Sequence, residues 1–326
     1  MLNFCTLFDS VYLSRGVAMY NSLKKHCENF HLYIFAFDDD CYRILKEFQL
    51  EDATIISLKE FENEDLLRIK PTRTRGEYCW TCTPSTISYV LDNYDVDNCT
   101  YLDSDLYFYS SPQPLLDEMG DASVLITPHR YTKKYDQSQK TGIYCVQFVT
   151  FKKDERGLHV LDWWKNACIE WCYNRFEDGK FGDQKYLDDW PMRFDGVYVS
   201  QNLGGGVAPW NMQQYTFNPN KEGEIIGTEK KNGNLFKVIF FHFHSFIFID
   251  ENTFSPRPFY KREESSIIYL FRSYIKEIKD LRQKYSSIRD KERYLKGYKR
   301  LKYDLEVFVR RGLKELHYKE LLHKNI

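Results

Sequence analysis

The chain has 326 residues, of which 43% are hydrophobic and 29% charged, and its formal net charge is −1. This composition describes a globular protein with a large core, in one large domain or two small ones, and no run approaches the roughly 18 apolar residues of a membrane span. We expect no signal peptide, because the opening residues MLNFCTLFDS lack a basic region and a long apolar stretch. Nine scattered cysteines predict reduced thiols and a cytoplasmic protein, since the pair Cys79 and Cys82 has no second pair at zinc-binding spacing.

The charge is unevenly distributed along the chain. Residues 257–326 hold 20 of the 46 Lys and Arg residues but only 10 of the 47 Asp and Glu residues. This segment therefore carries a formal charge of +10, and the preceding part carries −11. A basic tail predicts a negatively charged partner, such as a membrane surface or nucleic acid, but a solvated helical face explains the same charge equally well.

Strand-like and helix-like segments alternate in the first part of the sequence. Apolar runs predict strands at 3–8, 31–37 and 53–57, and helical spacing or a capping aspartate predicts helices at 11–26 and 38–48. The alternation predicts an α/β domain with a single mixed, mostly parallel sheet flanked by helices. Neither GxGxxG nor GxxxxGK[ST] is present, which disfavours a Rossmann-type dinucleotide site and a P-loop.

The middle of the chain continues this pattern. We predict a helix at 77–94 that Pro84 begins or kinks, strands at 123–127 and 142–151, an amphipathic helix at 154–176, a short helix that opens at 181–184, a glycine-rich loop at 201–211 and an alternating strand at 238–248. After residue 260, apolar residues recur every three or four positions. This heptad-like stripe predicts two helices that pack on the domain, on each other or on a second chain.

Two carboxylates lie at a break between strand segments. Asp103-Ser104-Asp105 follows the strand-like Tyr101-Leu102 and precedes the apolar run from Leu106 to Tyr109. Oxygen ligands of this kind suit Mg²⁺ or Mn²⁺, and a carboxylate-bound cation suits a diphosphate-bearing substrate. For the tripeptide alone, a plain turn is the favoured interpretation, and the surrounding motifs favour the cation site.

An ordered set of motifs resembles a known enzyme family. The set is a first strand that ends near Asp9 with a tyrosine soon after, YLDSDLYF, FGDQ, APWN and a late histidine strand. It is similar to the GT-A glycosyltransferases, and most like glycosyltransferase family eight and its bacterial relatives, over roughly residues 1 to 250. The resemblance implies a GT-A-type catalytic domain at 1–256, followed by a basic amphipathic helical extension at 257–326.

The resemblance implies a metal site. Asp103 and Asp105 match the metal-binding Asp-x-Asp, Ser104 lies between them beside the nucleotide, and a late histidine completes the metal shell. His242 and His244 are the candidates. We prefer His244, because it precedes Ser245, where the strand can break; the alternative is a pair of structural core histidines.

The resemblance also implies residues that bind the donor and the sugar. Thr6, Asp9 and Tyr12 match the segment that grips the uridine, and Arg15 reaches either a phosphate or the surface. Gly204 and Gly205 allow a ligand to approach the backbone, or simply form a loop. The catalytic pair is Asp183 and Gln184, beside the sugar and acceptor, although Asp183 also suits a helix N-cap.

Two departures from the family pattern stand out. Family-eight members commonly carry Asn-x-Gly where this chain has Cys145-Val146-Gln147, and they follow the late histidine with Gly and Lys-Pro-Trp, which this chain lacks. A phosphate contact would then come from Arg73 or Arg75.

The expected function is metal-dependent transfer of a hexose from a nucleotide-diphosphate sugar, with UDP as nucleotide and Mn²⁺ or Mg²⁺ as cofactor, to a glycan or glycolipid acceptor. By analogy with the family, we expect a retaining reaction in the synthesis of a cell-surface glycan such as lipopolysaccharide or capsule. We expect a cytoplasmic enzyme that contacts the inner face of the membrane, or a second copy, through its C-terminal helices, and no nucleic-acid partner. The rivals are a sugar nucleotidyltransferase, which would need a glycine-rich basic loop after the first strand, and a non-catalytic nucleotide- or sugar-binding protein of the same fold.

Overall fold

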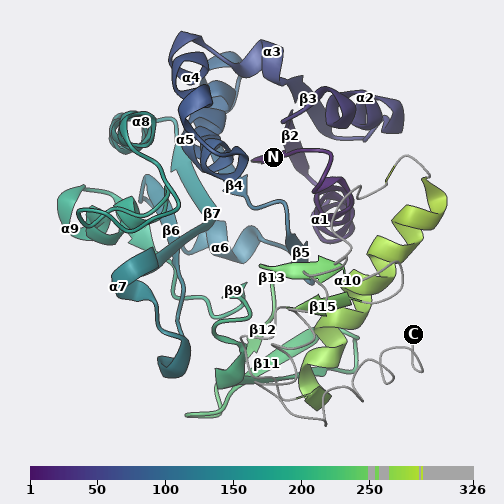
Figure 1. Ribbon diagram of the computed structural model, residues 1–326. Coiled ribbons are helices and arrows are strands. Elements are labelled where there is room, and N and C mark those ends of the chain that lie inside the picture. Colours follow the sequence, from purple (N-terminus) through teal and green to yellow (C-terminus); the bar gives the residue numbers. More distant parts are fainter. Residues whose placement is uncertain (249–253, 257–263, 286–287, 289–326) are drawn as a thin grey trace, which may run out of the picture.

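The computed structural model describes residues 1–248, 254–256, 264–285 and 288 (Figure 1). A seven-stranded sheet in the order β3-β2-β1-β4-β7-β6-β8 forms the centre of the molecule. Its strands are β1 (Leu2–Phe8), β2 (Phe30–Ala36), β3 (Ala53–Ser57), β4 (Asn98–Leu102), β6 (Val124–Pro128), β7 (Tyr144–Lys152) and β8 (Val197–Val199). Only β7 runs antiparallel to both of its neighbours, β4 and β6, so the predicted mixed, mostly parallel sheet is confirmed.

Helices pack around this sheet, and their ends follow from the sequence. The longer ones are α1 (Leu13–His26), α2 (Asp39–Phe48), α5 (Arg75–Asn93) and α8 (Glu155–Glu170). Asp38 caps α2 by accepting a hydrogen bond from the backbone N–H of Cys41, which satisfies a donor that the helix leaves unpaired. Helix α5 begins at a capping box formed by Thr74 and Glu77, so Pro84 lies inside the helix instead of beginning it.

Short helical segments connect the larger elements. They are α3 (Leu58–Phe61), α4 (Glu64–Ile69), η1 (Lys70–Thr72), α6 (Gln113–Asp117), η2 (Lys133–Tyr135), α7 (Ser138–Thr141), η3 (Lys185–Asp189), α9 (Trp190–Arg193) and η4 (Met212–Gln214). Within the part of the chain that the structure describes, no helix combines the length and the apolar character needed to cross a bilayer.

A small second sheet lies where β4 ends. It consists of β5 (Leu106–Phe108), β13 (Phe240–His242) and β9 (Gly205–Val207), with β13 in the middle, antiparallel to β5 and parallel to β9. The predicted glycine-rich loop therefore contains a buried strand. The predicted strand at 238–248 is interrupted, because a turn at 244–245 separates β13 from β14 (Phe246–Phe248).

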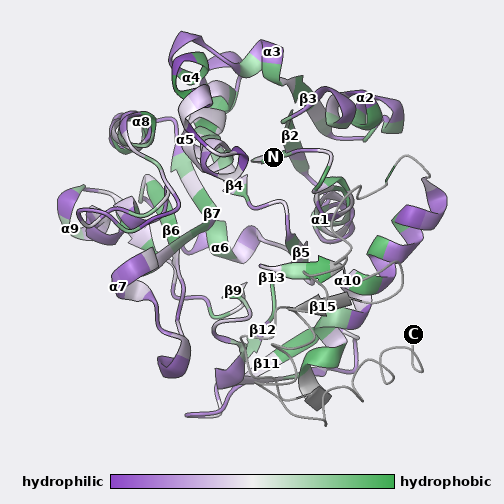
Figure 2. Ribbon diagram, viewed as in Figure 1, coloured by the Kyte–Doolittle hydropathy of each residue, from purple (hydrophilic) through white to green (hydrophobic). Residues whose placement is uncertain are grey.

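The C-terminal part adds two further sheets and a long helix. These are β10 (Tyr215–Pro219), β11 (Ile225–Glu229) and β12 (Leu235–Lys237), the pair of β14 with β15 (Phe254–Pro256), and α10 (Glu264–Lys284). Helix α10 packs against α1 and β10, and hydrophobic and hydrophilic residues alternate along it (Figure 2). The predicted division at residue 257 therefore does not isolate α10, which belongs to the packed body. The second predicted helix of the tail lies outside the described residues.

Candidate active site

The Asp103-Ser104-Asp105 segment is a turn that joins β4 to β5. The backbone N–H of Asp103 donates to the carbonyl of Gln147 on β7 (3.0 Å), and the N–H of Leu106 donates to the carbonyl of Asp103 (3.2 Å). These bonds fix the turn between the large and the small sheet. The turn and the carboxylate site, which the sequence offers as alternatives, are thus compatible in one structure.

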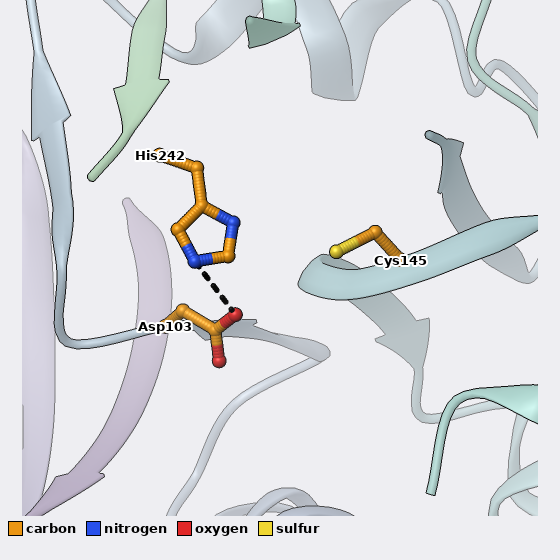
Figure 3. A group of neighbouring side chains, drawn as sticks. All are labelled: Asp103, Cys145 and His242. Carbon is orange, nitrogen blue, oxygen red and sulfur yellow. Dashed lines mark ion pairs between the residues drawn. The ribbon is translucent and has the colours of Figure 1, made fainter. Parts of the chain in front are cut away.

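His242 lies against both carboxylates. It is the last residue of β13, buried and opposite Leu106 in the register with β5. Its Nε2 lies 3.0 Å from Oδ1 of Asp105. The same nitrogen lies 3.6 Å from Oδ2 of Asp103, the ion pair that is dashed in Figure 3. The side chain of Asp103 keeps 29% of its surface exposed, so an external ligand can approach this side of the cluster.

Gln147 fixes the orientation of the imidazole. Its Oε1 lies 2.8 Å from Nδ1 of His242, and its Nε2 donates to Oγ1 of Thr127 (3.5 Å). Nδ1 of His242 therefore donates a hydrogen bond to Gln147, and Nε2 faces the carboxylates. From the sequence, Gln147 stands out only as a departure from the family pattern. Its place near the Asp-Ser-Asp turn follows from the pairing of β7 with β4, which the sequence alone does not show.

The carboxylates of the site have altered proton affinities. Burial, together with the charge of Asp105, raises the pKa of Asp103 to about 6 against the opposing effect of His242. Burial and the nearby Asp103 raise the pKa of Asp183 to about 7. For Asp105, the charge and hydrogen bond of His242 outweigh burial and lower the pKa. Likewise the two carboxylates raise the pKa of His242 against the effect of burial.

The donor set fits a divalent cation. Asp103 and Asp105 supply carboxylate oxygens and His242 supplies an imidazole nitrogen, a combination that suits Mn²⁺ and related ions. Burial is the main cause of the raised pKa of Asp183, and the charge of Asp103 adds to it, so a cation beside Asp103 would relieve this repulsion.

Asp183 and Gln184 lie beside this cluster. Asp183 is buried, and Asp103 lies close enough for its charge to raise the pKa of Asp183. Nε2 of Gln184 donates to the carbonyl of Thr141 (2.6 Å). The two predicted catalytic residues are therefore near the Asp-Ser-Asp turn, with the Gln184 amide held by the α7 segment.

Asp9 and Arg75 are paired with each other. Nε of Arg75 lies 2.5 Å from Oδ2 of Asp9, and its Nη2 lies 3.0 Å from Oδ2 of Asp38. The other oxygen of Asp9 accepts from the backbone N–H groups of Val11 (2.9 Å) and Tyr12 (3.2 Å). A nucleotide that contacts either side chain must therefore share or replace part of this ion pair.

Arg15 lies inside the molecule and not on its surface. Its Nη2 donates to the carbonyl of Phe246 (3.2 Å), and its guanidinium lies 4.5 Å from the centroid of the Tyr12 ring. Its charge contributes to the lowered pKa of Asp105. Arg15 therefore connects the predicted nucleotide segment with the carboxylate cluster.

Three predicted ligand-contacting residues have packing roles. The side chain of Thr6 reaches no surface. A Cβ on Gly204 would lie 2.0 Å from the carbonyl oxygen of Lys237, and a Cβ on Gly205 would lie 2.5 Å from the side chain of Leu115. Close packing around β9 thus accounts for both glycines, and their contact with a ligand stays a prediction.

The structure favours His242 over the preferred His244 as the metal ligand. His244 is exposed in the turn after β13, and its ring centroid lies 5.6 Å from that of His242. Trp210 of the APWN segment contacts both rings edge-on. Its ring centroid lies 5.3 Å from that of His242 and 5.5 Å from that of His244. The strand ends at His242 and a turn follows at 244–245, so the geometry favours His242, while the choice between the two histidines stays a prediction.

We therefore expect His242→Ala to abolish Mn²⁺ binding and His244→Ala to weaken it less than about tenfold. Loss of even an outer partner of a metal site costs about 10–100-fold in affinity, and loss of a direct ligand costs more. Titration of each variant with Mn²⁺, followed by electron paramagnetic resonance of the free ion, measures the difference. If His242→Ala bound Mn²⁺ as the wild type does and His244→Ala did not bind it, His244 would be the metal ligand.

Comparison with known proteins places the chain in a family. No family model matches it. YfnD of Bacillus subtilis (strain 168) is 30% identical over 282 residues, which are 85% of this chain and 88% of YfnD. The chain belongs to the YfnD family. YfnF of the same organism is 34% identical over 257 residues, 76% of this chain and 83% of YfnF, and both relatives are uncharacterized proteins.

Solved structures confirm the fold of this YfnD-family chain. The galactosyltransferase LgtC, in complex with donor and acceptor sugar analogs, matches with a TM-score of 0.52 and 14% identity. The match covers 87% of this chain and 100% of LgtC, and an active-site mutant of LgtC matches with a TM-score of 0.51. The predicted GT-A fold is thus confirmed, whereas membership of family eight stays a prediction.

Proposed function

We propose that this chain is a metal-dependent glycosyltransferase that moves a hexose from a UDP-sugar to a carbohydrate acceptor. The observation that carries the proposal is the contact of His242 with both Asp103 and Asp105, at the carboxyl end of β4 in a GT-A fold. The fold match to LgtC, which was solved with donor and acceptor sugar analogs, supports the same class of substrate.

Asp103, Asp105 and His242 would hold Mn²⁺ or Mg²⁺, with Ser104 beside the nucleotide. Such a cation supplies positive charge against the departing diphosphate. Gln147 keeps Nε2 of His242 aimed at the cation position by holding the proton on Nδ1. Arg15, close enough to lower the pKa of Asp105, adds a fixed positive charge on the same side.

Asp183 and Gln184 would act on the sugar. A carboxylate at the position of Asp183 can accept hydrogen bonds from sugar hydroxyls, and the amide of Gln184 can steady the positive charge that develops at the anomeric carbon. An inverting reaction would need a general base for the acceptor, and Asp188 is a candidate near Gln184. Asp188, however, already accepts a hydrogen bond from the N–H of Ile143 (2.6 Å) and pairs with Lys185 (2.6 Å). These contacts favour the retaining reaction, in which the leaving diphosphate takes the acceptor proton.

Calorimetry with UDP in the presence of Mn²⁺ or of a chelator tests the proposal. We expect binding that depends on the metal. Equal affinity for UDP with Mn²⁺ and with a chelator would show that UDP binding does not depend on a metal. Metal-dependent binding without turnover of any nucleotide sugar would make the protein a non-catalytic binder.

Gln184→Ala should slow sugar transfer by about 10²-fold or more and leave the affinity for UDP unchanged. The amide acts on charge that exists only in the transition state, so its loss affects kcat and not ground-state binding. Single-turnover kinetics at saturating donor measure this effect. A loss of UDP affinity equal to the loss of rate would instead assign Gln184 to donor binding.

The cellular context of the proposal follows from the family analogy. A bacterial cell-surface glycan is the acceptor that the analogy favours, in a cytoplasmic enzyme at the inner face of the membrane. Buried residues of α10, such as Leu270 and Ile278, pack on the domain, so this face is occupied. Membrane contact or pairing with a second copy would then fall to residues 289–326, which lie outside the described residues.

A further inference from the structure

Cys145 shares the site with the carboxylates and His242. Ligand atoms of Asp103, Cys145 and His242 all lie within 4.8 Å of one another. Figure 3 shows the three side chains converging from separate elements. Cys145 and Gln147 are two residues apart on β7, so they share one face of the strand, and Gln147 already bonds His242.

The surroundings of Cys145 favour a ligand role. The residue is buried against Ala208 and Trp210, its sulfur lies within 4.8 Å of a ring nitrogen of His242, and it forms no disulfide. Asp103, by contrast, is partly exposed. The cluster thus has three protein donors, of which Asp103 is partly exposed, and three protein ligands are the number that catalytic zinc sites use.

We propose that Asp103, Cys145 and His242 form a binding site for borderline divalent ions such as Zn²⁺ and Co²⁺, with the Cys145 thiolate as the third protein ligand. On coordination the sulfur forms the bond to the ion, and the thiol proton passes to solvent. Thiolate selects softer ions than carboxylate does, and affinity of such a mixed N, O, S site rises from Mn²⁺ through Co²⁺ to Zn²⁺. The site therefore binds Zn²⁺ far more tightly than it binds Mn²⁺ or Mg²⁺.

The inference rests on the metal site of the proposed function but has its own test. Metal-free full-length protein is titrated with Co²⁺, and the near-ultraviolet thiolate-to-cobalt charge-transfer band is recorded. We expect the band in the wild type and in Cys79→Ser, a change at a partly exposed cysteine of α5 outside the cluster. Cys145→Ser should lose the band and bind Zn²⁺ more than about 100-fold more weakly, since even outer-shell losses cost about 10–100-fold.

Zinc K-edge X-ray absorption of the wild type provides a readout that needs no variant. One sulfur scatterer among nitrogen and oxygen scatterers supports the inference. A shell of nitrogen and oxygen alone, or a charge-transfer band that survives in Cys145→Ser, overturns it. If Mn²⁺-dependent UDP binding still requires Asp103 in that case, the proposed function stands without the thiolate; if no divalent ion binds, both fall.

Discussion

Asp103→Ala is expected to fold normally and to lose Mn²⁺-dependent UDP binding by at least about 100-fold. The side chain is partly exposed and has a carboxylate oxygen 3.6 Å from Nε2 of His242, so its removal deletes a cation ligand while opening little space in the core. Calorimetry with UDP, with and without Mn²⁺, measures the loss. Asp162→Ala is the matched control, because Asp162 is an exposed carboxylate on α8 whose contact is a surface ion pair with Lys165.

Asp105→Ala should also abolish Mn²⁺-dependent UDP binding, but a loss of stability would make its result harder to interpret. Asp105 is buried and forms an ion pair with His242 at 3.0 Å. Breaking a buried pair by removing one partner costs about 3–5 kcal/mol of stability. UDP affinity that is unchanged in Asp103→Ala, with and without metal, would contradict the assignment of the carboxylate pair to the cation.

Leu270→Ala is expected to lower the free energy of unfolding by about 2–5 kcal/mol, because a fully buried side chain would leave a cavity. Leu270 lies on α10, whose buried face continues through Tyr274, stacked on Phe243 with ring centroids 3.7 Å apart. Tyr109 also donates a hydrogen bond from its hydroxyl to the backbone carbonyl of Leu270. Urea denaturation measures the change.

Ser273→Ala, an exposed change on the same helix, should alter stability by no more than about 0.5 kcal/mol. A Leu270→Ala variant as stable as the Ser273→Ala control would show that α10 does not belong to the core. A chain that ends before Glu264 should aggregate, since it exposes the apolar surface that α10 covers. Packing on the domain is one of the three alternatives that the apolar stripe of the tail left open.

Local patterns in the sequence were sufficient for much of the fold. The first strands and helices were predicted to within a few residues, because alternation and the Asp38 cap are signals carried by neighbouring residues. The stripe of Ile267, Phe271 and Tyr274 correctly indicated a buried helix face. Its partner could not be predicted, since α1 lies more than 200 residues away in the chain.

The site was predictable only in part. Asp103 and Asp105 stand together in the sequence, so their pairing needed no tertiary information. The choice between His242 and His244 depended on where β13 ends, which is set by its pairing with β5 and β9. Cys145 and Gln147 come to the site through the β4–β7 pairing, a long-range contact that no local pattern reveals.

Release of UDP from a panel of nucleotide sugars, with Mn²⁺ and with a chelator, tests the central claim most directly. We expect that at least one UDP-hexose is hydrolysed slowly with Mn²⁺ and that a chelator stops the reaction. We also expect Asp103→Ala to be inactive and Asp162→Ala to release UDP at the rate of the wild type. Contradiction would be a wild-type protein that releases nucleotide from no sugar donor with any divalent ion, yet forms pyrophosphate from a sugar phosphate and a nucleoside triphosphate.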